Sequence, residues 1–141
     1  MQQQQQQRDL TRMMNNIQTS EDKLANEERK LKKHQTKSTE KEADLKSKQD
    51  ELAALENNKD KSKDVLKSIE KAKKEIIKSE EKLSKSKVDI EKSSKKIQGL
   101  QNQIQESKIK KQELAKKQEE EKRLKEEEKA KKEKEKQEKK K

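Results

Sequence analysis

Aliphatic residues recur along this chain at intervals of seven. One series begins at Leu10 and a second begins at Leu55, and serine replaces an aliphatic residue once in each series. The members are Leu10, Ile17, Leu24, Leu31, Ser38, Leu45 and Leu52, followed by Leu55, Ser62, Ile69, Ile76, Leu83, Ile90, Ile97 and Ile104. A seven-residue repeat corresponds to about 3.5 residues per turn, which gives packed helices a left-handed supercoil. The pattern therefore predicts an all-α protein with a heptad coiled coil over residues 10–114.

Both series fit one heptad frame, because the step from Leu52 to Leu55 joins the two core columns of a coiled coil. The stripe crosses from one column to the other over residues 52–69. We expect the coiled-coil interface to be formed by the aliphatic residues Leu10, Ile17, Leu24, Leu31, Leu45, Leu52, Leu55, Leu66, Ile69, Ile76, Leu83, Ile90, Ile97 and Ile104.

This stripe is narrow, with roughly one large aliphatic residue in each heptad. Full burial of a leucine or isoleucine is worth about 1.5–3 kcal/mol, and half of the usual core positions contribute nothing. A homodimer held by the stripe alone would be marginal. We therefore expect helices of other proteins as partners, in a hetero-oligomer rather than a homodimer.

Serines form a column of their own, three residues after the stripe in the second half of the chain. Its members are Ser79, Ser86, Ser93 and Ser107. Two interpretations are open. The serines can flank the stripe at solvent-facing positions, or they can form a seam of small residues that allows a partner helix to approach closely.

The segment Asn57–Ser62 has no apolar residue and is the weakest part of the pattern. The heptad phase is nevertheless kept through Ser62, and neither glycine nor proline marks a turn there. We therefore favour a single long helix over residues 10–114, which would be roughly 150 Å long at about 1.5 Å per residue. The alternative is an antiparallel helical hairpin that turns near Asn57-Asn58.

The two ends differ from the heptad region in composition. Residues 1–9 include six consecutive glutamines, typical of a disordered or frayed tail. Residues 115–141 alternate blocks of lysine and glutamate, with acid-before-base pairs four residues apart such as Glu128–Lys132. Each such pair adds about 0.2–0.5 kcal/mol to a helix. We predict a solvated single helix here, ending in a frayed basic segment.

Composition narrows the function further, because only 22% of the residues are hydrophobic, none is aromatic and 50% are charged. Such a chain cannot bury enough apolar surface to form a compact globule with an enclosed pocket. The sequence has no cysteine, and His34 is its only histidine. We therefore expect no enzyme, no cofactor and no metal site, and we expect His34 to lie on the surface or in the helix seam.

Lysine predominates near the C-terminus, and the net charge is +11. Attraction to polyanions such as acidic tubulin surfaces, RNA or anionic lipid is therefore an expectation. Specific DNA recognition is not expected, because aromatic residues are absent and there are only four arginines. The expected contacts are Lys129, Lys131, Lys132, Lys134, Lys136, Lys139, Lys140 and Lys141.

In its heptads the chain resembles the coiled-coil rods of myosin tails, chromosome-segregation arms and cytoskeletal or axonemal accessory proteins. The stretch Ser107-Lys108-Ile109-Lys110-Lys111-Gln112-Glu113-Leu114, with the charged run behind it, also resembles the C-terminal region of the pallidin family. Pallidin is a coiled-coil subunit of the complex that builds lysosome-related organelles. Both resemblances imply a non-catalytic structural or adaptor role.

We thus predict a coiled-coil structural or adaptor subunit of a cytoskeletal or trafficking complex. The alternative is a polyanion-binding module that acts through its lysine-rich end, and a further one is a chain that stays unassembled and mostly disordered. No apolar run approaches the roughly 18 residues needed to span a bilayer. The first residues hold no apolar signal segment either, so we expect a cytoplasmic protein, with association with the cytoskeleton as the finer expectation.

Overall fold

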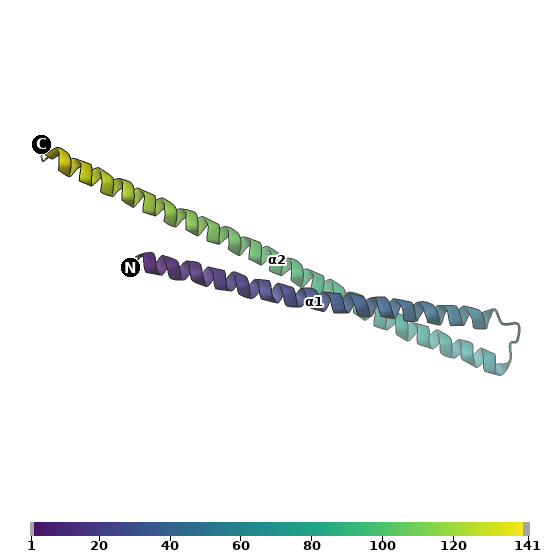
Figure 1. Ribbon diagram of the computed structural model, residues 1–141. Coiled ribbons are helices and arrows are strands. Elements are labelled where there is room, and N and C mark those ends of the chain that lie inside the picture. The colour runs from purple at the N-terminus through teal and green to yellow at the C-terminus, as the bar shows by residue number, and fades with distance from the viewer. Residues whose placement is uncertain (1, 140–141) are drawn as a thin grey trace. The chain divides into compact units, whose positions relative to one another are not determined.

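The computed structural model describes residues 2–139, which form two long helices joined by a short loop (Figure 1). Helix α1 spans Gln2–Glu56 and helix α2 spans Lys63–Lys139. The described residues contain no strand, so the all-α prediction is confirmed. Over the same residues, neither helix is long and apolar enough to cross a membrane.

Residues 57–62 are not helical, so the single long helix favoured from the sequence is wrong at this point. The loop lies where the hairpin alternative puts the turn. Polar side chains stabilise it by bonding to nearby backbone groups. Asn58 Oδ1 accepts from the Asp60 N–H at 3.2 Å, and Asp60 Oδ1 accepts from the Ser62 N–H at 3.1 Å. Such local bonds compete with the helical hydrogen-bond ladder, which is why Asn, Asp and Ser favour turns.

Both helix ends next to the loop are capped by side chains. The Lys61 ammonium donates to the carbonyl oxygen of Glu56 at 2.6 Å, at the end of α1. At the start of α2, Ser62 Oγ accepts from the backbone N–H of Val65 at 3.4 Å, as an N-cap serine does. Asp64 lies in the first turn, where a negative charge interacts favourably with the helix dipole. The segment thus contains both a stop and a start signal for helices.

The chain forms two compact units, each built from a segment of α1 and a segment of α2. The hairpin unit is Leu24–Gly99, which includes the loop. The terminal unit holds the remaining residues, of which 2–23 and 100–139 are described. In each unit the two segments run antiparallel. In the terminal unit, for example, Glu21 contacts Lys108 while Gln2, at the start of α1, contacts Lys125 further along α2.

The core of each unit is thin. Ile69, Ile76 and Leu83 are buried in the hairpin unit, and Ile17 and Ile104 are buried in the terminal unit. Each of these five side chains still exposes 7–9% of its surface, and no large side chain among the described residues is fully buried. Two helices cannot enclose a side chain on all sides, so solvent reaches every core position.

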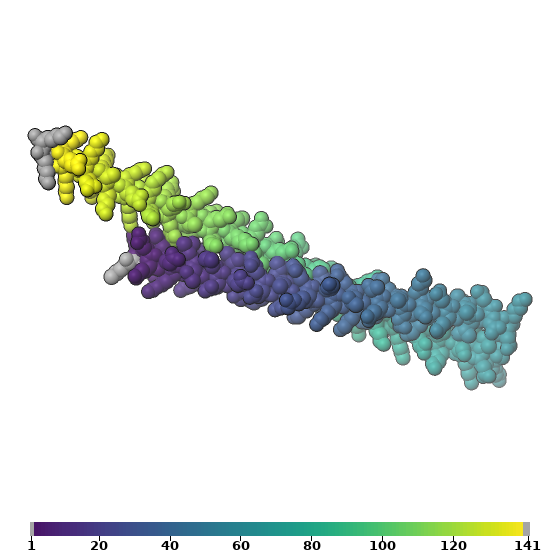
Figure 2. Space-filling model, viewed as in Figure 1, coloured from purple at the N-terminus to yellow at the C-terminus, as the bar shows by residue number. Residues whose placement is uncertain are grey.

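The two ends of the chain are helical where they are described. Helix α1 begins at Gln2, so residues 2–9, predicted to belong to a disordered or frayed tail, are part of the helix. Residues 119–139 of α2 are helical and exposed at every position. Beyond Lys125 no hydrogen bond or ion pair to α1 is present among the described residues, and the yellow end of α2 stands clear on the face shown in Figure 2.

Candidate functional site: the helix-pairing interface

The predicted interface residues lie almost entirely on the inner faces of the two units. Ile17, Ile69, Ile76, Leu83 and Ile104 are buried. The partly buried ones are Leu10, Leu24, Leu31, Leu45, Leu52, Leu55, Ile90 and Ile97.

Leu66 is the exception among the predicted interface residues. Its side chain is 50% exposed, and the preceding residue, Val65, takes the partly buried position instead. Val65 starts a column that continues at intervals of seven through Ala72 and Ser79. The inner face of α2 is therefore set by the columns of Val65 and Ile69, and Leu66 lies just outside it.

A second inner column on α1 was not predicted, because most of its members are polar. It lies three residues after the stripe, and all of its members are buried or partly buried. The members are Met13, Ser20, Glu27, His34, Lys41, Lys48 and Leu55. The available signal was the position of this column three residues after the aliphatic stripe. The serine column on α2 has the same position relative to its own stripe.

The serine column of α2 lies on the inner face and not at solvent. Ser79, Ser86 and Ser93 expose only 5%, 3% and 4% of their surfaces, less than any aliphatic residue of the core. Ser107 is partly buried in the terminal unit. The structure therefore has the seam of small residues that was one of the two interpretations of this column.

In the hairpin unit, the serine column meets the polar column of α1 through two hydrogen bonds. The Ser93 hydroxyl donates to Glu27 Oε1 at 2.9 Å, in a buried position. The Lys48 ammonium donates to Ser79 Oγ, also at 2.9 Å. A serine hydroxyl can both donate and accept, so one residue type accommodates an acid at one position and a base at another.

Glu27 is the only buried charged residue among residues 2–139, with 9% of its surface exposed. The ammonium of Lys96 lies 4.0 Å from Glu27 Oε2, so the carboxylate has a hydrogen bond on one oxygen and a positive charge near the other. Burying a carboxylate without such partners would be costly. The burial of Glu27 thus depends on the Ser93 hydroxyl and the Lys96 ammonium that lie opposite it on α2.

Polar contacts in the terminal unit are more exposed. The ammonium of Lys108 lies 3.2 Å from Glu21 Oε1, and the Gln6 amide donates to Glu121 Oε2 at 3.2 Å. Exposed ion pairs contribute only about 0–1 kcal/mol each. This unit therefore depends on its few aliphatic contacts, chiefly those of Ile17 and Ile104.

The lysines predicted to contact polyanions are fully accessible where they are described. Lys129, Lys131, Lys132, Lys134, Lys136 and Lys139 are all exposed, whereas Lys140 and Lys141 lie outside the described residues. The predicted pair Glu128–Lys132 is present at 3.9 Å. Glutamates thus remain interspersed among the lysines along this helix.

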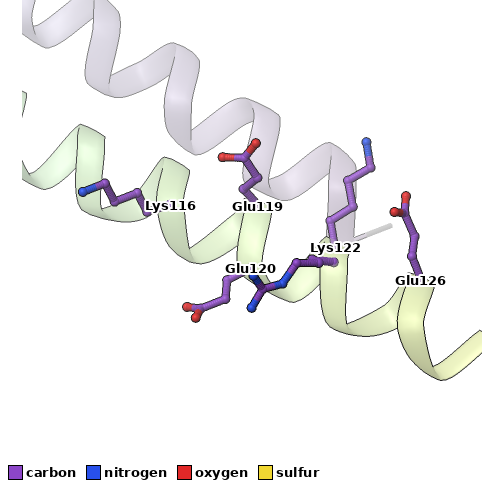
Figure 3. A pocket seen from close by; sticks show the side chains of 6 residues that line it. Lys116, Glu119, Glu120, Lys122 and Glu126 are labelled. Atoms are coloured by element: carbon purple, nitrogen blue, oxygen red, sulfur yellow. The ribbon is translucent and has the colours of Figure 1, made fainter.

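An open hollow on α2 of the terminal unit is lined only by charged residues (Figure 3). Their side chains point in different directions and do not converge on a common centre, as Glu119, Glu120 and Lys122 show (Figure 3). Within residues 2–139, no group of three or more histidine, cysteine, aspartate or glutamate side chains has an arrangement that would hold a metal ion. The helix-pairing interface is therefore the best-defined functional surface of the described chain.

No protein-family model, curated protein or solved structure matches this chain. The resemblances to coiled-coil rods and to the pallidin family therefore stay predictions.

Proposed function

We propose that this chain is a non-catalytic coiled-coil structural or adaptor subunit, which assembles with partner helices in a cytoskeletal or trafficking complex of the cytoplasm. The observation that supports this best is the thin core, in which no large side chain among residues 2–139 is fully buried. Two paired helices leave their own interface partly open to solvent. A further helix packed alongside would bury more of it.

The outer face of α2 offers a separate place for a partner helix. Leu66, Ile77 and Val88 are 50%, 56% and 45% exposed and follow one another at intervals of eleven. Eleven residues make slightly more than three helical turns, so successive members are displaced by only about 20° around the helix. The three side chains therefore lie in one row, separate from the inner columns. Burying each of them would contribute up to about 1.5–3 kcal/mol.

Co-purification after chemical crosslinking in cells tests this proposal. We expect the tagged chain to recover a partner in constant ratio, with crosslinks that connect α2 to a helical segment of that partner. Changing Ile77 and Val88 together to aspartate should abolish recovery, because a charge cannot be buried in an apolar contact. The matched control changes Ser94 and Gln98, two exposed polar residues of the same helix, to aspartate.

Two outcomes would contradict the proposal. One is a chain that recovers no partner in constant ratio from the cell. The other is equal recovery by the Ile77/Val88 variant and by the Ser94/Gln98 control, which would show that the outer row makes no contact. Circular dichroism of both variants separates loss of a partner from loss of the fold.

A second candidate function is attraction to polyanions through the lysine-rich end. It is favoured by the exposure of all six described lysines in the predicted set, at the end of α2 that has no α1 segment opposite it. Near an anionic membrane surface, each lysine contributes about 1 kcal/mol. The interspersed glutamates reduce this attraction and make it sensitive to salt.

Binding to phosphatidylserine-containing vesicles tests this second function. Changing Lys131, Lys132 and Lys134 to glutamine should weaken vesicle binding by about tenfold or more at low salt. The control changes Lys71, Lys73 and Lys74, which are equally exposed in the hairpin unit, to glutamine. If both variants lose the same amount of vesicle binding, the binding depends on the net charge of the chain and not on its C-terminal segment.

A further inference from the structure

The two helices present unlike inner faces to each other in the hairpin unit. On α2, the column beside the aliphatic stripe consists of small serines, Ser79, Ser86 and Ser93. On α1, the corresponding column consists of long polar residues at the same spacing, namely Glu27, His34, Lys41 and Lys48. A face with short side chains thus lies against a face with long ones.

We propose that these two columns decide which helices pair and in what register, so that α1 selects α2 rather than a copy of itself. The hydrogen bonds at the two ends of the serine column support this. Near the loop, Ser79 accepts from Lys48, and two heptads further along α2 Ser93 donates to Glu27, each at 2.9 Å. Lys48 and Glu27 are three heptads apart on α1, and the reach of their long side chains makes up the difference of one heptad. Shifting α2 by one heptad would replace Ser93 and Lys96 at the buried Glu27 carboxylate by Ser86 and Asp89 in one direction, and by Leu100 and Gln103 in the other. The first shift brings a second carboxylate to Glu27, and the second leaves it without a hydroxyl or an ammonium group.

Pairing of like faces is disfavoured for a different reason on each helix. Two α1 faces would bring lysines such as Lys41 and Lys48 into a half-buried seam, where like charges repel one another. Two α2 faces would place serine against serine, which adds little apolar surface to the narrow aliphatic stripe. Only the unlike pair fills the seam and satisfies the buried polar groups. A helix that replaced α1 on α2 would need long polar residues at the same spacing.

This selection concerns the chain's own helices, so it is tested on the pure full-length protein without any partner. The main variant changes Ser79, Ser86 and Ser93 together to leucine, which doubles the width of the apolar stripe on α2. The matched control changes three exposed serines of the same unit, Ser47, Ser68 and Ser94, to leucine. Both variants gain the same number of leucines.

Sedimentation equilibrium over a wide range of concentrations reports the outcome. The control is expected to keep the association state of the unaltered chain. The inner variant is expected to form larger, concentration-dependent assemblies, because its α2 faces now pair with each other. If the inner variant sediments like the unaltered chain, the serine column does not decide pairing and the proposal is overturned.

A charge reversal tests the register without adding apolar surface. Glu27→Lys places two ammonium groups together, because Lys96 lies next to this position. Ser93→Asp places two carboxylates together, because Ser93 bonds to Glu27. Each change alone should lower the melting temperature, and the double variant should regain most of the loss because the introduced ammonium and the introduced carboxylate attract each other. If the double variant loses as much melting temperature as the two single variants together, the assigned register is overturned.

Discussion

Ile76→Asp is expected to unfold most of the hairpin unit. Ile76 exposes only 8% of its surface and lies between Ile69 and Leu83 in the α2 stripe. The change removes a buried aliphatic side chain and places a charge without a partner in the seam, which together cost about 3 kcal/mol or more. Because the core is thin, the loss is comparable to the stability that a unit of this kind can have. Far-UV circular dichroism should show a large fall in helicity.

The neighbouring residue supplies the control. Ile77 is also isoleucine in the same helix, but it is 56% exposed. Ile77→Asp makes the same chemical change with the same loss of helix propensity, and it should lower the melting temperature only slightly. Equal effects of the two variants would mean that the inner face of α2 has been assigned wrongly.

Lys82→Pro is expected to have the second large effect. Lys82 is an exposed residue within α2, so its side chain contributes little to packing. Proline lacks the backbone N–H and clashes with the preceding turn, which costs about 3 kcal/mol or more inside a helix. Helicity and melting temperature should both fall sharply. The effect comes from the backbone alone, so it reports whether this position is helical.

Lys59→Pro makes the same substitution in the loop between α1 and α2. The backbone N–H of Lys59 donates no helical hydrogen bond, unlike those of Asn57 and Asn58, so the melting temperature should change little compared with Lys82→Pro. In a single uninterrupted helix the two substitutions would be equally damaging. Similar losses for both variants would therefore contradict the two-helix structure.

The helical content and the inner aliphatic residues could be predicted because both depend on a short-range period. A residue such as Leu83 recurs every seven positions with Ile76 and Ile90, and that spacing defines one face of a helix whatever the partner is. The partner itself could not be predicted. A stripe has the same sequence signature whether it pairs with another chain or with a second helix of its own.

The turn near Asn57-Asn58 is only the alternative prediction from the sequence, because the segment has neither glycine nor proline and the heptad repeat extends through Ser62. Its signals are the side-chain oxygens of Asn58, Asp60 and Ser62, which bond to the backbone locally. A second signal lay in the heptad phase, because the single heptad frame fitted to both series is wrong: the pair of inner columns on α2 does not continue the pair on α1. The inner pair on α1 is Leu52 and Leu55, and the pair on α2 that starts with Ile69 lies two heptads and three residues later. An unbroken helix would have to absorb this offset by overwinding, whereas a loop absorbs it without strain.

The polar column of α1 was not found because long charged residues are normally solvent-exposed. Glu27 and Lys48 are tolerated at inner positions since serines on α2 leave space and provide hydrogen-bonding hydroxyls. This depends on which residues α2 brings opposite them. The prediction of a single helix placed no residue of α2 opposite Glu27 or Lys48. The pairing of the two columns could therefore not be predicted.

Pulsed electron paramagnetic resonance tests the central claim, that α1 folds back on α2. The chain has no cysteine, so spin labels can be attached at Ala43→Cys and Ser84→Cys, two exposed positions. They lie level with each other, since each is five residues from the Lys48–Ser79 contact on its own helix. With excess unlabelled chain present, the paired helices predict a distance within about 30 Å, because packed helices lie about 8–10 Å apart and the label arms add to this. A distance of about 60 Å, the separation along one continuous helix at about 1.5 Å per residue, would contradict the account.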